Sequence, residues 1–586
     1  MFQASRILIF LGGLCYYLAL PPLNLAPLAL AVPVLWGIVI SKEQQHSRCL
    51  YATVFITAFL FWLASIWWIA CPHPLTALGL VALSAFLSLY WLLFFISART
   101  AVHRFRVPLL VAMPVCWMGT EYLRCHILGG FSFCALEHTF YLYPVLIQLA
   151  SVGGSLLVGG GIMLLGASLC VPCLFVVNFL TANMQKTQEK TNCIPVQFIN
   201  PVPGCIVLHL LFCLLIALIV PLIVVSIRTV HSNPSNDGTK FCIVALQGNR
   251  QVYLHSTFDE AKNNFMQFRD LTYQEIGKRK QNGDPLPDAI IFPETVCPIS
   301  VLEFEGLVKP TDLGGTEEEV MAWERHFREF AQDIDTPVIL GLSTLIFKDE
   351  PDNPIRLNSA LLVQPTPISP VSSMYRYDKM HLVMFGEYIP FAEYLPDNFI
   401  LKTLCPEAHR GTKPTAFPIG QWREGNKPIE ASVNICFEST VAHLIRNQIL
   451  TLRKEGHDPR LLINMSNDGW FRNSHQMEQH MATHVFRAVE NRMWYVTATN
   501  GGYSAIIDPH GVIRSIGKRG EAEAVASTIW VNINEPHALT IYQRLGDGYA
   551  LVFALLVLGL AAIHIRDVTC SSSVRGRGEP KGQSIS

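Results

Sequence analysis

Three side chains in the second half of the chain have the types needed for covalent catalysis by a thiol. Cys436 lies in SVNICFEST directly after an apolar run, Glu294 lies in IIFPETVCP, and Lys379 lies in YRYDKMHLVMFGEYIPF. A cysteine nucleophile needs a base that takes its proton and a donor that stabilises the oxyanion of the tetrahedral intermediate. A carboxylate can be that base, and an ammonium group can stabilise the oxyanion and keep a nearby thiolate ionised. Together these residues predict acyl-transfer chemistry.

Each of the three residues also has an ordinary structural explanation. A cysteine at a strand end is more often a buried filler than a nucleophile. A glutamate after proline is usually a solvated turn residue, and a lysine among aromatic residues is commonly a surface cation-π partner. The order of the three along the chain, and the segments around them, favour catalysis.

The segment that carries these residues alternates between strand-like and helical patterns. Strand-like runs lie at 241–248, 288–294, 337–343, 429–438, 460–468, 493–500 and 504–513, and amphipathic helical stretches lie at 256–279, 317–333 and 475–491. Such alternation predicts an α/β layered domain. Several runs end in polar or small residues, and α/β folds place reacting groups at strand ends. We therefore expect the site to be assembled from those ends.

The rest of the chain has the composition of a membrane protein. Of 586 residues, 51% are hydrophobic and only 15% are charged, against roughly 25% charged in soluble proteins. Runs close to the roughly 20 residues of a spanning helix lie at about 7–20, 25–40, 50–70, 75–97, 107–120, 144–173, 205–226 and 548–565. We expect eight spans. The first two could instead include a signal peptide, but no AxA-like cleavage site is present, so a helical hairpin is the prediction.

These patterns divide the chain into four parts. We expect a membrane domain of seven spans at 1–227, an extracytoplasmic catalytic domain at 228–547, a last span at 548–566 and a flexible cytoplasmic tail at 567–586.

The basic residues between spans predict the orientation, because cytoplasmic loops are rich in Lys and Arg. With eight spans, one side receives Arg6, Lys42, Arg48, Arg99, Arg104, Arg106, Lys186, Lys190, Arg566, Arg575, Arg577 and Lys581. That side is expected to be the cytoplasm, and only Arg228 opposes this assignment. The catalytic domain would then face the opposite side, the periplasm in a bacterium with two membranes.

Several other classes of protein are not supported. A net charge of -1 without a basic run gives no reason to expect nucleic acid. In the soluble domain, none of Cys242, Cys297, Cys405 and Cys436 is part of a CxxC or HxxxH pair. No Walker sequence or dinucleotide fingerprint is present, so we expect no metal and no cofactor. Most of the sixteen cysteines lie in or beside apolar spans; in the soluble domain, whether Cys242, Cys297 or Cys405 pair with one another stays open.

An acidic and a basic residue lie near the outward end of the fifth span. Glu121 and Arg124 precede the Gly-rich and aromatic loop GGFSF at 129–133, where substrate could meet the soluble domain. A structural ion pair and a functional role are both open for them.

The order Glu in a PE turn, Lys before an FGE segment and Cys in a CxE turn resembles the nitrilase superfamily of carbon-nitrogen hydrolases. More specifically, YDKMHLVMFGEYIP, SNDGWF at 466–471, RAVENR at 487–492 and ATNGG at 498–502 resemble signatures of the bacterial apolipoprotein N-acyltransferase family. The WxxxExLR pattern of Trp117, Glu121, Leu123 and Arg124 resembles that family too, as do seven spans before the domain and one after it. The resemblance covers nearly the whole chain.

The resemblance implies a fold and a reaction. The fold is a polytopic helical membrane domain plus an α-β-β-α nitrilase-like sandwich. Glu294 would be the general base, Lys379 the oxyanion stabiliser and Cys436 the nucleophile, with Glu387 and Glu438 as supporting acids. Cys436 would take an acyl chain from a membrane phospholipid and pass it to the α-amine of the diacylglyceryl-cysteine of an apolipoprotein, by a ping-pong route without metal or nucleotide. Such an enzyme sits in the bacterial inner membrane.

The sequence departs from the family pattern at a few positions. Met384 stands where Pro is usual, Arg472 where Gly is usual and Phe437 where Tyr is frequent. A Trp that commonly follows residues 247–249 is missing, and Tyr253 could replace it. We expect Tyr253, with Trp117, Glu121 and Arg124, to be possible substrate-binding residues.

Two other functions are consistent with parts of this pattern. A membrane-tethered amidase or nitrilase would use the same three residues to hydrolyse a small amide, but eight spans exceed what tethering needs. A non-enzymatic scaffold would be expected to have lost one of the three residues, and all are present. Nothing in the sequence requires more than a monomer.

Overall fold

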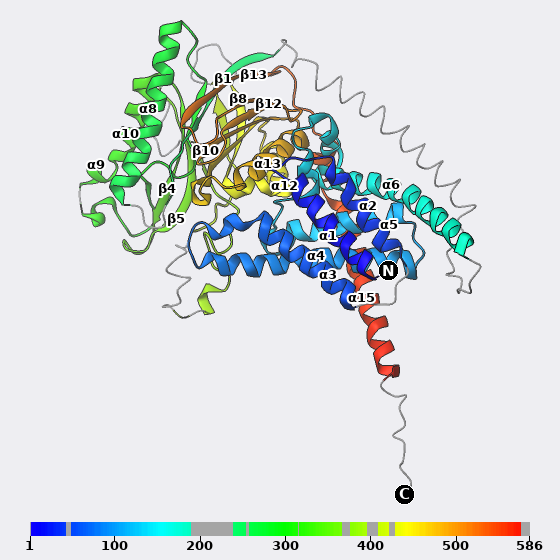
Figure 1. The fold of residues 1–586 in the computed structure, drawn as a ribbon. Helices are drawn as coiled ribbons and strands as arrows, with labels where there is room; N and C mark the ends of the chain where they lie inside the picture. The colour runs from blue at the N-terminus through cyan, green and yellow to red at the C-terminus, as the bar shows by residue number, and fades with distance from the viewer. Residues whose placement is uncertain are drawn as a thin grey trace.

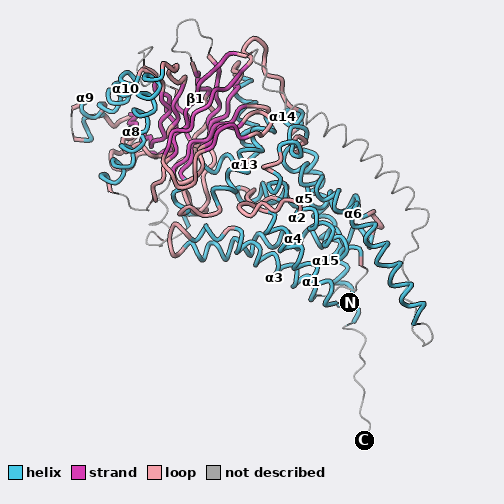
Figure 2. Tube along the Cα trace, turned by 45° about the horizontal axis from the view of Figure 1, so that its top comes forward, coloured by secondary structure: helices cyan, strands magenta, loops and turns pink. Residues whose placement is uncertain are grey.

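The protein consists of a helical bundle packed against a domain of two β-sheets (Figure 1). The computed structural model describes residues 2–42, 48–188, 238–252, 257–314, 316–365, 375–394, 396, 408–420 and 428–575. In both views the bundle lies on one side of the sheets, and the last helix runs from the bundle toward the C-terminus (Figure 2).

In the described part of the chain the bundle has seven helices: α1 (Phe2–Ala19), α2 (Leu28–Ser41), α3 (Arg48–Ser65), α4 (Thr76–Arg104), α5 (Leu109–His126), α6 (Ala150–Gln188) and α15 (Gly548–Arg575). Within the described residues, four stretches are long and apolar enough to cross a membrane: Arg48–Ser65, Thr76–Arg104, Ala150–Cys170 and Gly548–Cys570. The apolar helices α1 and α2 are shorter. The expected span at 205–226 lies outside the described residues. The structure thus supports a helical membrane region, and the count of eight spans stays a prediction.

The basic residues of the bundle gather at one of its ends. The Arg99 guanidinium of α4 donates to the carbonyl oxygens of Val39 (3.0 Å) and Lys42 (3.2 Å) at the end of α2. Arg104 lies 3.7 Å from Asp567 on α15. The ends of α2, α4 and α15 therefore meet where the sequence predicts the cytoplasmic side.

Among the residues that the structure describes, the second domain is built on a sheet of seven strands and a sheet of six. The first has the order β13-β1-β2-β4-β5-β6, with β3 paired to β4; the second has the order β12-β11-β10-β9-β8-β7. The strands of the first are β1 (Thr239–Gln247), β2 (Ala289–Ile291), β3 (Val301–Phe304), β4 (Val338–Phe347), β5 (Ile355–Val363), β6 (Arg376–Asp378) and β13 (Glu523–Val531). Those of the second are β7 (Ala416–Ile419), β8 (Ile429–Ile435), β9 (Pro459–Asn467), β10 (Trp494–Asn500), β11 (Ala505–Ile507) and β12 (Ile513–Ile516).

Alternation along the strands creates a layered core. On β1, Phe241, Ile243 and Ala245 pack between the two sheets, whereas Val244 and Leu246 pack on the other side with residues of α8 (Phe258–Asn282) and α10 (Ala322–Ile334). On the far side, α12 (Ala442–Lys454) and α13 (Gln476–Asn491) cover the second sheet. Successive residues of a strand face opposite sides, so each central strand supplies both layers. The order of layers is helix, sheet, sheet, helix.

Two predicted elements are wrong in detail. The run at 504–513 is not one strand but the antiparallel pair β11 and β12. The chain reverses at Pro509 and at Gly511, whose φ of +84° suits a turn. The helix predicted at 317–333 is divided into α9 (Glu317–Val320) and α10.

Helix α13 joins the catalytic domain to the bundle. All sixteen of its residues are buried, because one side packs on the sheet and the other on the membrane domain. Gln479 accepts from the Trp68 indole N–H (2.9 Å) and donates to the Ser65 carbonyl oxygen (2.8 Å). At the other end of α13, a Glu490 carboxylate oxygen accepts from the backbone N–H of Ser155 on α6 (2.9 Å). These buried polar contacts fix the domain on the bundle.

Candidate active site

Cys436 lies at a sharp turn between β8 and a short 3-10 helix, η8 (Cys436–Thr440). Its φ is +53°, a conformation that costs a non-glycine residue free energy and that is found at functional sites. Two donors hold its carbonyl oxygen: the Ser439 hydroxyl (3.0 Å) and the Asn464 side-chain amide (3.2 Å). The residue is partly exposed, so the turn presents the thiol at the end of the strand.

Glu294 lies in the turn after β2, at the same edge of the domain. Its carboxylate accepts from the Asn358 amide (2.7 Å), the Lys379 ammonium (3.2 Å) and the backbone N–H of Asn467 (3.0 Å). The turn needs glycine at position 341 of β4, because a Cβ there would lie 2.1 Å from the Pro293 carbonyl oxygen. The carboxylate is therefore held from several directions.

Lys379 follows β6 and is buried between two carboxylates. Its ammonium donates to Glu387 (2.7 Å) and Glu294 (3.2 Å), and the side chain is 1% exposed. Burial alone would lower the pKa of Lys379, but the charges of Glu294 and Glu387 raise it well above its usual value. Lys379 is therefore a fixed positive charge.

The thiol of Cys436 shares this electrostatic environment. Burial and then the charge of Glu294 raise the pKa of the Cys436 thiol well above its usual value, while the charge of Lys379 lowers it by a smaller amount. The resting group is thus a thiol, and a base must take its proton during attack. The Glu294 carboxylate is the candidate for that base.

Glu387 and Glu438 hold the segments that carry the reacting groups. Besides Lys379, Glu387 accepts from the backbone N–H of Val383 (2.8 Å). Glu438 is fully buried and accepts from the backbone N–H groups of Ile435 (2.7 Å), Met380 (2.7 Å) and His381 (2.9 Å) and from the Tyr377 hydroxyl (2.8 and 2.9 Å). Glu438 therefore connects the turn of the nucleophile to the segment of the lysine.

A Glu438→Gln variant should form the acyl adduct more slowly than the wild type. Its rate should also no longer fall at acid pH. Burial raises the pKa of Glu438 to about 7, and its four donors need the ionised form. The glutamine would turn an N–H group toward other N–H groups, so we expect a rate loss of about 10- to 100-fold, the equivalent of ~1.5–3 kcal/mol. The wild-type rate should also fall as pH drops below about 7, and this acid limb should be missing in the variant.

The contribution of Glu438 to the free energy of unfolding should fall as pH rises, whereas the acylation rate should rise. A carboxyl whose pKa is raised on folding contributes stability that is fully present below its unfolded pKa of about 4.3 and is lost as pH rises through the folded value, here about 7. Glu430→Gln is the matched control, because Glu430 lies on β8, the strand before the turn, and is paired with His457 near the surface. If Glu438→Gln acylated at the wild-type rate and its rate still fell below about pH 7, the ionised Glu438 would not be needed to hold the turn.

Three contacts bring the GGFSF loop of the membrane domain close to Cys436 and Lys379. The Gly129 carbonyl oxygen lies 2.9 Å from the His381 Nε2 atom, and the Ser132 hydroxyl donates to the Thr440 carbonyl oxygen (2.6 Å). The rings of Phe133 and Phe437 have centroids 6.2 Å apart. The bundle thus contacts residues that closely follow Lys379 and Cys436 in the chain.

Glu121 and Arg124 form a buried ion pair that orders this loop. Arg124 Nε donates to Glu121 (3.0 Å), and Arg124 Nη1 donates to the carbonyl oxygens of Phe131 and Phe133, the latter at 3.1 Å. Trp117 is also buried, 1% exposed. These contacts favour a structural ion pair over a functional role for Glu121 and Arg124. Substrate binding by Trp117, Glu121 and Arg124 stays a prediction. Tyr253 lies outside the described residues.

An Arg124→Leu variant should be much less stable than the wild type. It leaves the Glu121 carboxylate buried without its partner, a change that costs about 3–5 kcal/mol. Arg104→Ala is the control, because its pair with Asp567 is 61% and 36% exposed and is worth about 0–1 kcal/mol. Thermal unfolding in detergent compares them, and equal small shifts in Tm would show that the buried pair does not stabilise the bundle.

A buried polar chain behind Cys436 was not predicted from the sequence. The Asp468 carboxylate lies 3.2 Å from His480 Nδ1, and His480 Nε2 lies 2.8 Å from the Ser439 hydroxyl, which donates to the Cys436 carbonyl oxygen. All three side chains are nearly inaccessible. The two histidine contacts support the conformation of the turn. The SNDGWF signature contains Asp468, but nothing in the sequence joins it to a helix residue twelve positions later.

Two family models match the chain. Residues 12–168 match the apolipoprotein N-acyltransferase N-terminal domain, and residues 288–533 match carbon-nitrogen hydrolase. The chain is similar to proteins named apolipoprotein N-acyltransferase from Geobacter metallireducens (24% identity, covering 96% of each chain) and Rhodopirellula baltica (24%, covering 95% of this chain and 96% of the relative). A third, from Bordetella bronchiseptica, is 26% identical over 93% of each chain.

The fold and the matched models define a membrane-embedded enzyme with a carbon-nitrogen hydrolase domain. The site has a thiol at a strand end and a buried carboxylate and ammonium beside it. Because both models and these relatives together cover almost the whole chain, the protein belongs to the apolipoprotein N-acyltransferase family and is an acyltransferase.

Proposed function

We propose that the protein transfers a fatty acyl chain from a membrane phospholipid to the N-terminal amine of the diacylglyceryl-cysteine of apolipoproteins, the last step of lipoprotein maturation. The observation that carries this proposal is the position of the Glu294, Lys379 and Cys436 group beside a loop of the membrane bundle. A water-soluble amide would not need such a site at the bundle, whereas a lipid does.

In the first half-reaction Cys436 attacks the ester carbonyl of the phospholipid. Glu294 takes the thiol proton as the sulfur–carbon bond forms, and the Lys379 ammonium stabilises the negative oxygen of the tetrahedral intermediate. When the intermediate collapses, the carbon–oxygen bond of the ester breaks and Glu294 returns the proton to the leaving alkoxide. The products are a lysophospholipid and a thioester on Cys436.

In the second half-reaction the lipoprotein amine attacks the thioester. Glu294 takes a proton from the nitrogen as the amide bond forms, and the carbon–sulfur bond breaks. The thiolate of Cys436 regains the proton, which restores the resting site. The two half-reactions use the same base and the same oxyanion donor, so no metal or cofactor enters them.

We further propose that the protein lies in the bacterial inner membrane as a monomer with its catalytic domain, residues 228–547, on the periplasmic side. The grouping of Arg99 and Arg104 at the end of the bundle away from the GGFSF loop supports this orientation. Membrane parts at 1–227 and 548–566 and a cytoplasmic tail at 567–586 complete this division of the chain.

The test is a two-stage assay with the full-length protein in detergent. Incubation with phospholipid alone should give a hydroxylamine-labile acyl adduct by mass spectrometry. Addition of a synthetic diacylglyceryl-cysteine peptide should then discharge the adduct and add the acyl mass to the peptide, whereas the same peptide with an acetylated amine should leave the adduct intact.

The alternative, an amidase, has a distinct outcome. Release of ammonia from small amides, without an adduct from phospholipid or transfer to the peptide, would contradict acyl transfer and favour hydrolysis.

A further inference from the structure

Three side chains with metal-binding atoms meet where the bundle joins the catalytic domain. His126 is the last residue of α5, His443 is the second residue of α12, and Asp547 directly precedes α15. One ligand atom from each lies within 4.8 Å of the other two. They are far apart in the sequence, which explains why no metal motif is visible there.

The hydrogen bonds of His126 leave one ring nitrogen available. Its Nδ1 lies 2.8 Å from the Tyr122 carbonyl oxygen, so this atom carries the proton and Nε2 has the free lone pair. Nε2 lies 3.9 Å from Asp547 Oδ2, a separation that an ion between them would bridge. A histidine ligand in a metal site usually has this arrangement, with its second nitrogen donating to a carbonyl oxygen.

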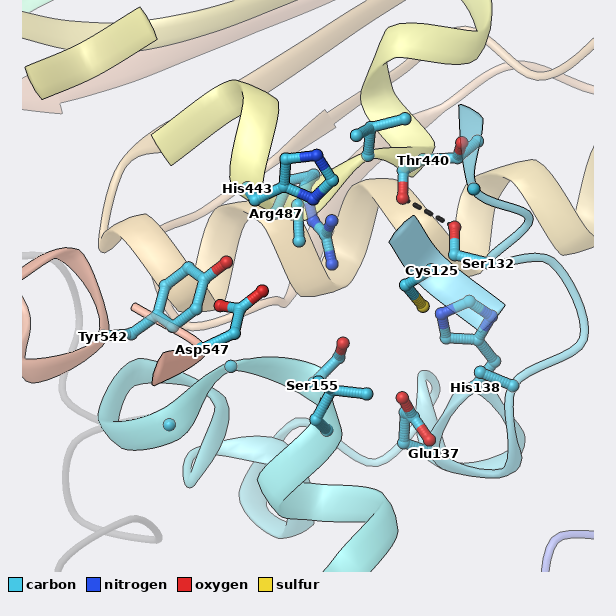
Figure 3. A pocket seen from close by; sticks show the side chains of 17 residues that line it. Cys125, Ser132, Glu137, His138, Ser155, Thr440, His443, Arg487, Tyr542 and Asp547 are labelled. Carbon is cyan, nitrogen blue, oxygen red and sulfur yellow. Dashed lines mark hydrogen bonds between the residues drawn. The ribbon is translucent and has the colours of Figure 1, made fainter. Parts of the chain in front are cut away.

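The Asp547 carboxylate keeps acceptor positions for a cation. It lies beside the Tyr542 hydroxyl (Figure 3), which donates to it. A carboxylate can accept at about four positions on its two oxygens, so one hydroxyl donor leaves room for a bound ion.

A small cavity adjoins two of the three residues. It has a volume of about 20 Å³ and is lined by His443 and Asp547, with Glu137 and Arg487 also in its wall. Arg487 would repel a metal ion, but it is paired with Glu490 (2.9 Å). The cavity is large enough for one water.

The two imidazole rings stack on one another. Their centroids are 4.3 Å apart and their planes differ by 16°, so a common ion requires the His443 ring to rotate about its Cβ–Cγ bond while His126 keeps its contact with the Tyr122 carbonyl oxygen. His443 lines the cavity, which provides space for this rotation.

We propose that His126, His443 and Asp547 form a zinc site, with a water from the cavity as the fourth ligand. Two imidazoles and a carboxylate suit Zn²⁺ better than Mg²⁺ or Ca²⁺, which prefer oxygen ligands. The ion would join a membrane helix, the helix after the nucleophile turn and the last span. Its role is to hold the catalytic domain on the bundle, and it takes no part in the acyl-transfer steps.

The first experiment measures bound zinc. Full-length protein without an affinity tag is purified in detergent and analysed by elemental mass spectrometry, with His443→Ala, Asp547→Asn and the exposed control His326→Ala. The wild type and the control should hold about one zinc per chain, and the two site variants should lose about tenfold or more.

The second experiment uses only the wild type, so that a variant that does not fold cannot decide the result. Protein stripped with a chelator should gain thermal stability when ZnCl₂ is added and should not gain it with MgCl₂. Equal zinc content in all four proteins, or a wild type that holds no zinc and whose Tm does not respond to ZnCl₂, would overturn the proposal. Neither measurement depends on acyltransferase activity.

Discussion

A Cys436→Ala variant should be folded and should form no acyl adduct with any phospholipid. The substitution removes only the sulfur from a partly exposed side chain, and alanine has the same backbone restriction at a φ of +53°. The donors to the residue 436 carbonyl oxygen are unaffected, so the turn should persist. Covalent transfer needs the nucleophile, so both half-reactions should fall below detection.

The control for this variant is Cys242→Ser. Cys242 lies on β1 in the same domain, beside the Arg279 guanidinium (3.1 Å), and takes no part in the proposed reaction. It should keep the wild-type adduct, whereas unfolding curves should show that Cys436→Ala is intact. An adduct of unchanged yield on Cys436→Ala would mean that another residue carries the acyl group.

The positions of the candidate catalytic residues could be predicted because each is fixed by its immediate neighbours in the sequence. Cys436 and Glu294 follow apolar strands, and the strands are found where the pattern places them. The unusual Arg472 is also understandable, because its φ is +51°, a conformation that the usual glycine adopts without strain. Local pattern was sufficient at these positions.

The partners of those residues could not be predicted, because they come from distant parts of the chain. Asn358 on β5 donates to Glu294, 64 positions away, and Tyr377 donates to Glu438 across 61 positions. A single Asn in an apolar strand is a weak signal unless the neighbouring strand is known. The pairing of β1 with β13, near the other end of the domain, was missed for the same reason.

The contact between the two domains could not be predicted from the local sequence pattern either. The sequence of α13 predicts an amphipathic helix, yet its residues are buried on all sides. Gln479 is polar because it binds Trp68 and Ser65, more than 400 positions earlier. A polar residue that is satisfied by another domain cannot be distinguished by periodicity from one that faces water.

A Glu294→Gln variant should lose the thioester half-reaction at neutral pH and regain part of it at high pH. Glutamine keeps the shape of the side chain but cannot take the thiol proton, so we expect a loss of about 10²- to 10⁴-fold. Burial and the charge of Glu294 together raise the pKa of the Cys436 thiol. Without that base, the thiolate must form by exchange with hydroxide, and adduct formation should rise with pH.

The matched control is Asp288→Asn, at the opposite end of the same strand. Asp288 is also a buried carboxylate and accepts from the backbone N–H of Cys242 (2.7 Å), so its loss affects stability without touching the site. Its pH profile should follow the wild type. If Glu294→Gln retained the wild-type rate at neutral pH, the thiol would already be ionised beside Lys379. In that case a stable thiolate–ammonium pair, and not a general base, would activate the nucleophile.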